Sequence, residues 1–268
     1  MKPALLQIDA FSDTPFGGNP AAVCLLDQAR DEPWMQRVAA EMNLAETAFV
    51  VLGDGDDFPL RWFTPTTEVP LCGHATLAAA HALWETGYVP PSRAIGFNTL
   101  SGALTAQRSG DLIGIDLPAR PVVEAALPSP LTRALGFPTV WTGRTCEPAT
   151  SKFEYVVVTN ERGVRDARPD VAALRAIPGG VILTARSDDP SVHIVSRYFA
   201  AYYGVDEDPV TGSAHCALAT YWAPRLGRLS FTARQASARG GTLGVTLDGE
   251  RVQLTGHAVT VFSGELRA

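Results

Sequence analysis

The chain has 268 residues, of which 46% are hydrophobic and 19% are charged, and its formal net charge at pH 7 is -6. This composition is typical of a folded globular protein and excludes a disordered or fibrous chain. A net negative charge gives no general attraction to nucleic acids or to anionic membranes, so we expect neither as a partner. The length allows one large or two medium domains, and we expect two.

The distribution of apolar residues and cysteines predicts a cytoplasmic protein. Asp9 interrupts the apolar start of the chain before a signal-peptide core can form. No stretch reaches the roughly 18 apolar residues that a membrane span requires. Four cysteines, at positions 24, 72, 146 and 216, lack the dense spacing of a secreted disulfide framework, so we expect reduced thiols.

Short strands alternate with two helices in the first half of the chain. Apolar runs between turn-forming residues predict strands over 5–11, 21–26, 47–52, 60–63, 94–97, 103–107 and 112–117. Pro33 sits where a helix can begin, and apolar residues recur at helical spacing up to Asn43. The segment 75–84 is rich in alanine and apolar on all faces, which predicts a buried helix.

The second half repeats this order of elements after a proline-rich boundary at positions 118, 121, 128 and 130. Strands are predicted over 155–159, 181–184 and 193–199, and a second apolar helix over 214–226. We expect one domain over 1–118, with 258–268 packing back on it, and a second over 119–257. Two halves with many strands around one apolar helix suggest the duplication of an α+β unit.

Glycines precede both apolar helices, at Gly73-His74 and Gly212-Ser213. Glycine allows the backbone to approach a ligand closely, and the N–H groups of a first helical turn lack intrahelical partners. Such helix ends bind anions, so the two ends together predict a site for a substrate carboxylate. Taken alone, a glycine before a helix more often marks an ordinary tight turn, and it is the pairing of the two that favours a site.

Several ionisable residues near these helix ends are candidates for acid/base chemistry. Glu46 lies between a helix and a strand, where apolar neighbours would raise the pKa of a carboxylate toward neutrality. A glutamate at such a junction is more often a solvated charge. Asp208 is a candidate proton shuttle or a helix cap, His74 a proton donor or a cap, and Ser213 a substrate contact or a cap.

The cysteines and histidines near the two helices do not form a recognisable metal site. Cys72, His74, His215 and Cys216 match no common ligand spacing, and we expect no metal. A nucleophilic cysteine paired with a histidine is also conceivable in chemical terms, but no oxyanion-elbow motif surrounds Cys72.

At these residues the sequence resembles the PhzF-like family, which is named after a phenazine-biosynthesis isomerase and shares the diaminopimelate-epimerase fold. The resemblance covers nearly the whole chain. The matching segments are 9–11, 18–23, 43–49, 61–76, 196–200, 207–215 and 256–261.

The resemblance implies two similar domains, each a curled and mostly antiparallel sheet around a central helix, with the active site in a cleft between them. It also implies a homodimer and a cofactor-independent isomerase. Glu46 matches the family's catalytic glutamate, which moves a proton on a small carboxylate substrate. By the same resemblance, His74 and Asp208 assist proton movement, while the substrate-binding positions correspond to Asn19, Gly73, Gly212 and Ser213.

The sequence leaves two alternatives to this isomerase. Diaminopimelate epimerase uses two facing cysteines, and only the first of them is matched here, by Cys72; no cysteine stands ahead of the second helix. An amino-acid epimerase or racemase that uses Cys72 is therefore the less favoured enzyme. The other alternative is a family member that binds a small molecule without turning it over.

Overall fold

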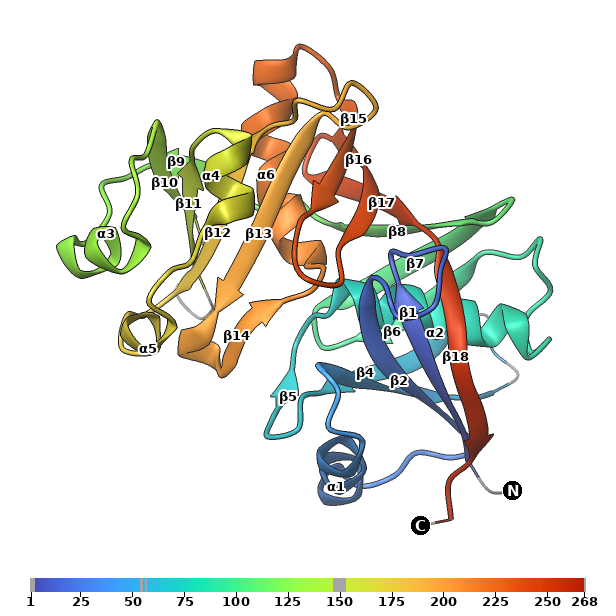
Figure 1. Ribbon diagram of the computed structural model, residues 1–268. Helices are drawn as coiled ribbons and strands as arrows, with labels where there is room; N and C mark the ends of the chain where they lie inside the picture. Colours follow the sequence, from blue (N-terminus) through green and yellow to red (C-terminus); the bar gives the residue numbers. More distant parts are fainter. Residues whose placement is uncertain (1–2, 54, 56, 147–152, 268) are drawn as a thin grey trace. The chain divides into compact units, whose positions relative to one another are not determined.

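The structure, a computed structural model, describes residues 3–53, 55, 57–146 and 153–267. The chain forms two compact units, unit 1 of Met1–Leu117 with Leu254–Ala268 and unit 2 of Pro118–Gln253. Both units combine helices with sheets, as the sequence predicts (Figure 1). Across the described residues, no helix is long and apolar enough to cross a membrane.

Unit 1 is a continuous series of paired strands. These are β1 (Ala4–Ala10), β2 (Asn19–Leu26), β3 (Glu46–Val51), β4 (Asp57–Phe63), β5 (Glu68–Val69), β6 (Ile95–Thr99), β7 (Gly102–Ser109), β8 (Leu112–Pro118) and β18 (Ala258–Glu265). Their order is β18-β1-β2-β3-β4-β6-β7-β8, and β5 also pairs with β4. The pairs β2/β3 and β4/β6 are parallel and the others antiparallel.

Helix α2 (Gly73–Glu85) is the core of unit 1. It packs against β1, β2, β3 and β18, and only His81 and Glu85 among its residues are not buried (Figure 1). Five of its thirteen residues are alanines, whose small side chains let the surrounding strands approach closely. The helix begins two residues before the predicted start, at Gly73 itself.

Helix α1 (Glu32–Met42) ends four residues before Glu46, where β3 begins. Asp31 caps it by accepting a hydrogen bond from the Trp34 amide at 2.7 Å, and Asn43 ends it in the left-handed conformation with φ 50°. Asparagine tolerates this conformation better than most residues. The turn that follows leads into Glu46, the first residue of β3.

Unit 2 contains the remaining elements. Its strands are β9 (Val122–Glu124), β10 (Trp141–Thr145), β11 (Glu154–Val158), β12 (Gly180–Arg186), β13 (Ile194–Ala200), β14 (Val205–Asp208), β15 (Ser230–Gln235), β16 (Gly241–Asp248) and β17 (Arg251–Gly256), which continues into unit 1. Its helices are α3 (Ser129–Leu135), α4 (Glu161–Asp166), α5 (Val171–Leu174), the 3-10 turn η1 (Ala201–Tyr203) and α6 (Gly212–Leu226).

The strand pairing of unit 2 follows the same pattern as that of unit 1. The order β9-β10-β11-β12-β13-β15-β16, with β14 added to β13, corresponds to β18-β1-β2-β3-β4-β6-β7, with β5 added to β4. The parallel pairs, β11/β12 and β13/β15, fall at the corresponding places. Helix α6 takes the place of α2, and it is likewise buried over most of its length.

The two core helices begin with the same local geometry. Their N-cap residues, Cys72 and Thr211, are both extended, with φ -145° and ψ 109° in the first and φ -114° and ψ 107° in the second. Four residues later, the hydroxyl of Thr76 donates to the Cys72 carbonyl at 2.6 Å, and His215 Nδ1 lies 2.8 Å from the Thr211 carbonyl. Thr76 and His215 therefore occupy equivalent positions.

His215 is fully buried and held at both ring nitrogens. Nδ1 donates to the Thr211 carbonyl, which leaves Nε2 to accept from the Ser196 hydroxyl at 3.2 Å. Burial lowers the pKa of His215 to about 4, because the interior disfavours the charged ring. The unfolded chain, in which the pKa is near 6.5, therefore binds more protons than the folded chain at mildly acidic pH.

We predict that His215 makes the protein less stable as the pH falls from 6.5 toward about 4. The free energy of unfolding should fall less steeply with acidification in His215→Gln than in the wild type, by on the order of 3 kcal/mol over this range. Urea denaturation at a series of pH values measures both slopes. Identical slopes in the two proteins would contradict the prediction.

Candidate functional site

Three elements of unit 1 bring Asn19, Glu46 and His74 together. Asn19 and Glu46 are the first residues of β2 and β3, and the two strands are parallel, with Ala21 opposite Glu46. Both side chains therefore lie at the same end of the sheet, where α2 also begins with Gly73 and His74. In the sequence, Glu46 and His74 follow Asn19 by 27 and 55 positions. The parallel pairing of β2 with β3 brings Glu46 close to Asn19.

His74 is the centre of this group. Its Nε2 lies 3.3 Å from Glu46 Oε2, and its Nδ1 lies 3.1 Å from Asn19 Nδ2 and 3.6 Å from Cys72 Sγ. From the sequence we expect Asn19 to bind the substrate, whereas in the structure its amide contacts the catalytic candidate His74. The contact between Cys72 and His74 is local, since both stand at the start of α2.

The surroundings of His74 keep its ring neutral. Its side chain is only 5% exposed, and burial lowers its pKa to about 3. The amide of Asn19 donates to Nδ1, which assigns the ring proton to Nε2, on the side of Glu46. Nε2 lies 3.3 Å from Glu46 Oε2 but makes no hydrogen bond. Glu46 itself keeps 19% of its side chain exposed.

In unit 2, Asp208, Gly212 and Ser213 are gathered where β14 leads into α6. Asp208 ends β14, and its Oδ2 accepts a very short hydrogen bond from the Thr211 hydroxyl. Gly212 and Ser213 form the first turn of α6, and Ser213 is partly exposed. The structure thus holds these three predicted residues within one short segment of unit 2.

Gln235 forms hydrogen bonds with this segment. It is not among the site residues that the sequence predicts. Its Oε1 accepts from the Thr211 amide at 2.9 Å, and its Nε2 donates to the Asp208 carbonyl at 2.7 Å and lies 3.3 Å from the Thr211 hydroxyl. Gln235 is fully buried at the end of β15. No motif surrounds it in the sequence, and only the pairing of β15 with β13 brings it to α6.

Comparison of equivalent positions shows that the two units differ at the place of Glu46. Glu46 begins β3 and Gly180 begins β12, and both pair with the preceding parallel strand at the corresponding register. A Cβ atom at Gly180 would lie 2.5 Å from the Tyr198 hydroxyl, so the phenol occupies the space that a side chain would need. Unit 2 therefore has no carboxylate at this position.

The nearby carboxylate of unit 2, Glu154, is neutralised inside the protein. Its Oε2 lies 2.5 Å from Arg120 Nη2, and its Oε1 accepts from the Tyr198 hydroxyl at 3.3 Å. Glu154 is 3% exposed, which makes the pairing with arginine necessary. Burial, followed by the charges of Glu154 and Asp208, raises the pKa of Tyr198 well above its usual value. The Glu154 group is therefore a structural ion pair.

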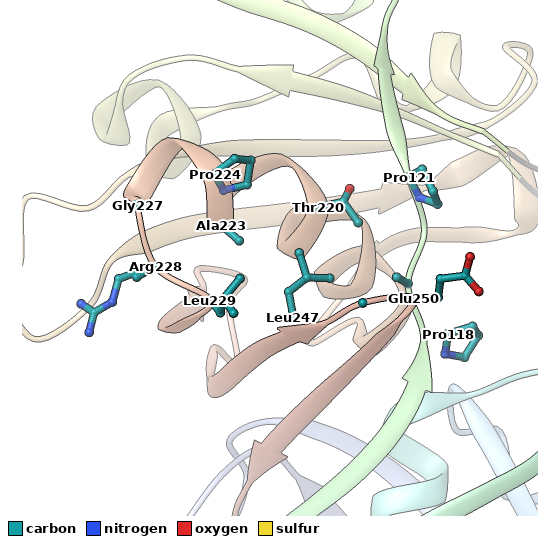
Figure 2. Close-up of a pocket in the computed structure, with 12 residues that line it drawn as sticks. Pro118, Pro121, Thr220, Ala223, Pro224, Gly227, Arg228, Leu229, Leu247 and Glu250 are labelled. Carbon is teal, nitrogen blue, oxygen red and sulfur yellow. The ribbon is translucent and has the colours of Figure 1, made fainter.

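A pocket of about 840 Å³ lies elsewhere in unit 2, beside the C-terminal half of α6 (Figure 2). Its lining is mostly apolar and comes from Thr220 to Leu229, from the β16 end and from the segment around Pro118 and Pro121. The charged side chains among its lining residues are Arg228 and Glu250. The described lining includes none of the residues predicted for catalysis or substrate binding.

Comparison with solved structures first defines the fold. A probable proline racemase from Agrobacterium radiobacter superposes with a TM-score of 0.69 over 98% of this chain and 92% of that one, at 13% identity. A phenazine biosynthesis protein of the PhzF family from Enterococcus faecalis gives a TM-score of 0.90 at 37% identity, with 100% of both chains covered. The fold is thus shared with racemases and with PhzF proteins.

The sequence then places the chain within one family. Residues 8–264 match the family described as phenazine biosynthesis-like protein, PhzC-PhzF, and the chain belongs to this family. A Pseudomonas aeruginosa protein described as an uncharacterized isomerase is 50% identical over 97% of both chains. The chain is accordingly an isomerase of the PhzF family, as the resemblance of its motifs implies.

We predict that Gln235→Leu destabilises unit 2. The substitution leaves the buried Thr211 amide and Asp208 carbonyl without their glutamine partner, which should lower the free energy of unfolding by about 2 to 4 kcal/mol. Gln253→Leu, at an exposed glutamine of the same unit, is the matched control and should change it little. Urea denaturation measures the difference, and equal losses in both variants would refute this role of Gln235.

Proposed function

We propose that this isomerase moves a proton on a small carboxylate-bearing substrate, without a cofactor, and that Glu46 takes up and returns that proton. The observation that carries the proposal is the position of Glu46 at the exposed edge of unit 1, 3.3 Å from a neutral His74. A carboxylate that is partly exposed can exchange a proton with a ligand. The equivalent position of unit 2 is the glycine Gly180.

His74 supports this proton transfer in two ways. Its ring stays neutral at physiological pH, so it does not neutralise Glu46 as a cation would. Its Nε2 proton faces the carboxylate and can stabilise the charge that returns to Glu46 when the proton leaves. We assign Asn19 the role of fixing the proton on Nε2, through its contact with Nδ1.

We extend the proposal to the two helix starts. The first-turn N–H groups of α2, at Gly73, and of α6, at Gly212, are suited to a substrate carboxylate. Asp208 is proposed to assist proton movement, and the Ser213 hydroxyl to bind the substrate. The resemblance of the 207–215 segment to the family supports these assignments.

Cys72 gives a second candidate function some support. Its Sγ lies 3.6 Å from His74 Nδ1, and it occupies the N-cap position of α2, where amide dipoles stabilise an anionic sulfur. An epimerase or racemase with Cys72 as the base would use this arrangement. Such an epimerase would need a second base at the N-cap position of α6. That residue is Thr211, whose hydroxyl is a poor base.

We predict that Glu46→Gln abolishes proton exchange. In deuterated water, the wild type should exchange a carbon-bound proton of at least one acid in a panel of amino acids, hydroxy acids and enolisable ring acids. Glu46→Gln should reduce that rate by about 100-fold or more, because glutamine cannot carry the proton. Mass spectrometry or NMR measures the label. Glu41→Gln, at an exposed glutamate of α1, should exchange as the wild type does. Equal rates in Glu46→Gln and the wild type refute the role.

We predict that Cys72→Ser keeps most of the exchange activity, because the thiol is not the group that carries the proton. The same panel and the same isotope measurement apply, with the wild type and Glu46→Gln run in parallel. A loss in Cys72→Ser as large as that in Glu46→Gln would favour the epimerase. Thermal stabilisation by an acid that shows no exchange in any variant would favour a binding protein.

A further inference from the structure

The group around His74 contains three different kinds of metal ligand. Glu46 offers a carboxylate oxygen, Cys72 a sulfur and His74 a ring nitrogen, and one such atom from each lies within 4.8 Å of the others. In the sequence, Cys72 and His74 together with His215 and Cys216 match no common ligand spacing, and Glu46 is not near them. Glu46 completes the set because the parallel pairing of β2 and β3 brings it to the start of α2.

The spacing of these atoms suits a small ion. Ligands bound tetrahedrally to Zn²⁺ at about 2.0 to 2.3 Å stand about 3.4 to 3.6 Å from each other. In unit 1, His74 Nε2 lies 3.3 Å from Glu46 Oε2, and Cys72 Sγ lies 3.6 Å from the His74 ring at Nδ1. The 3.6 Å contact of Cys72 is with Nδ1, so an ion on Nε2 requires the Cys72 side chain to turn toward that nitrogen, a movement for which the 4.8 Å limit on the group leaves little distance to cover.

His74 Nε2 is the nitrogen that is open for an ion. It is buried and makes no hydrogen bond, while Nδ1 is engaged by Asn19. When Nε2 binds a metal, Nδ1 keeps the ring proton and needs an acceptor. The Asn19 side chain can supply one by turning its amide so that the oxygen faces the ring, the kind of outer contact that metal-bound histidines usually have.

The charges decide which ion fits. The amide dipoles at the start of α2 disfavour a cation, but a Cys72 thiolate and the Glu46 carboxylate together balance the charge of a divalent ion. A sulfur and an imidazole ligand select Zn²⁺ over Mg²⁺ or Ca²⁺, which prefer oxygen. Three protein ligands leave the fourth position of the ion open.

We propose that Zn²⁺ binds to Glu46, Cys72 and His74 and thereby inhibits the isomerase. An ion on this set occupies the Glu46 oxygens and prevents them from carrying a proton. The inhibition rests on the proposed function, whereas the binding of Zn²⁺ does not. Excess Zn²⁺ would thus act as a reversible inhibitor that a chelator removes.

Binding is tested on the full chain without any substrate. Isothermal titration of the metal-stripped protein with Zn²⁺ should give one site that Mg²⁺ does not occupy. Cys72→Ser, His74→Gln and Glu46→Gln should each weaken the affinity by at least about tenfold. Cys146→Ser removes the exposed thiol instead and should bind Zn²⁺ as the wild type does. Circular dichroism of each variant identifies any that fail to fold.

Co²⁺ gives a spectroscopic signature of the same site. The wild type and Cys146→Ser should show thiolate-to-cobalt charge-transfer absorption, and Cys72→Ser should lose it. Cys24 does not compete, because burial raises its pKa to about 12 and keeps it protonated. Equal Zn²⁺ affinity in the wild type and all three ligand variants, or loss of the site in Cys146→Ser alone, overturns the proposal.

The two proposals fail in distinguishable ways. If Zn²⁺ binds through the three residues but Glu46→Gln still exchanges protons, the proposed function is wrong and the metal site stands. If exchange depends on Glu46 but Zn²⁺ neither binds nor slows it, the metal site is wrong and the function stands.

Discussion

The burial of most of one helix within each unit is the constraint on which the rest of the structure depends. A helix surrounded by strands can bury its apolar side chains on all sides, but its first turn must still satisfy or expose its N–H groups. Helices α2 and α6 therefore begin at an edge of their sheets, at Gly73 and Gly212. The same requirement that makes a dry core thus produces two helix ends suited to anions.

Pairing of the strands then determines which side chains surround each helix end. In unit 1 the parallel strands β2 and β3 start together and bring Asn19 and Glu46 to His74. In unit 2 the strand β15 brings Gln235 to the segment between Asp208 and α6. The same pattern of pairing thus carries Glu46 and His74 in one unit and, in the other, a hydrogen-bond network in which Gln235 links the Asp208 carbonyl to Thr211.

The sequence predicts the helices better than the site. The spacing of apolar residues is enough to locate α2 and α6 to within two residues at their starts, because a helix buried on all faces has an unmistakable composition. The residues Glu46 and His74 are found through the family's motifs, but their contact depends on strand register. Gln235 contacts Thr211, 24 positions before it, and Asn19 contacts His74, 55 positions after it. No local sequence pattern predicts contacts between residues so far apart.

Under the proposed function, Glu46 alone takes up and returns the proton, and this has a stereochemical consequence. A reaction with bases on both sides of a substrate inverts a carbon centre, because one base removes the proton and the other delivers a new one from the opposite face. With Glu46 as the single base that we propose, the proton would leave and return on the same face. Such a suprafacial shift retains part of an isotopic label within the molecule when return is faster than exchange with water.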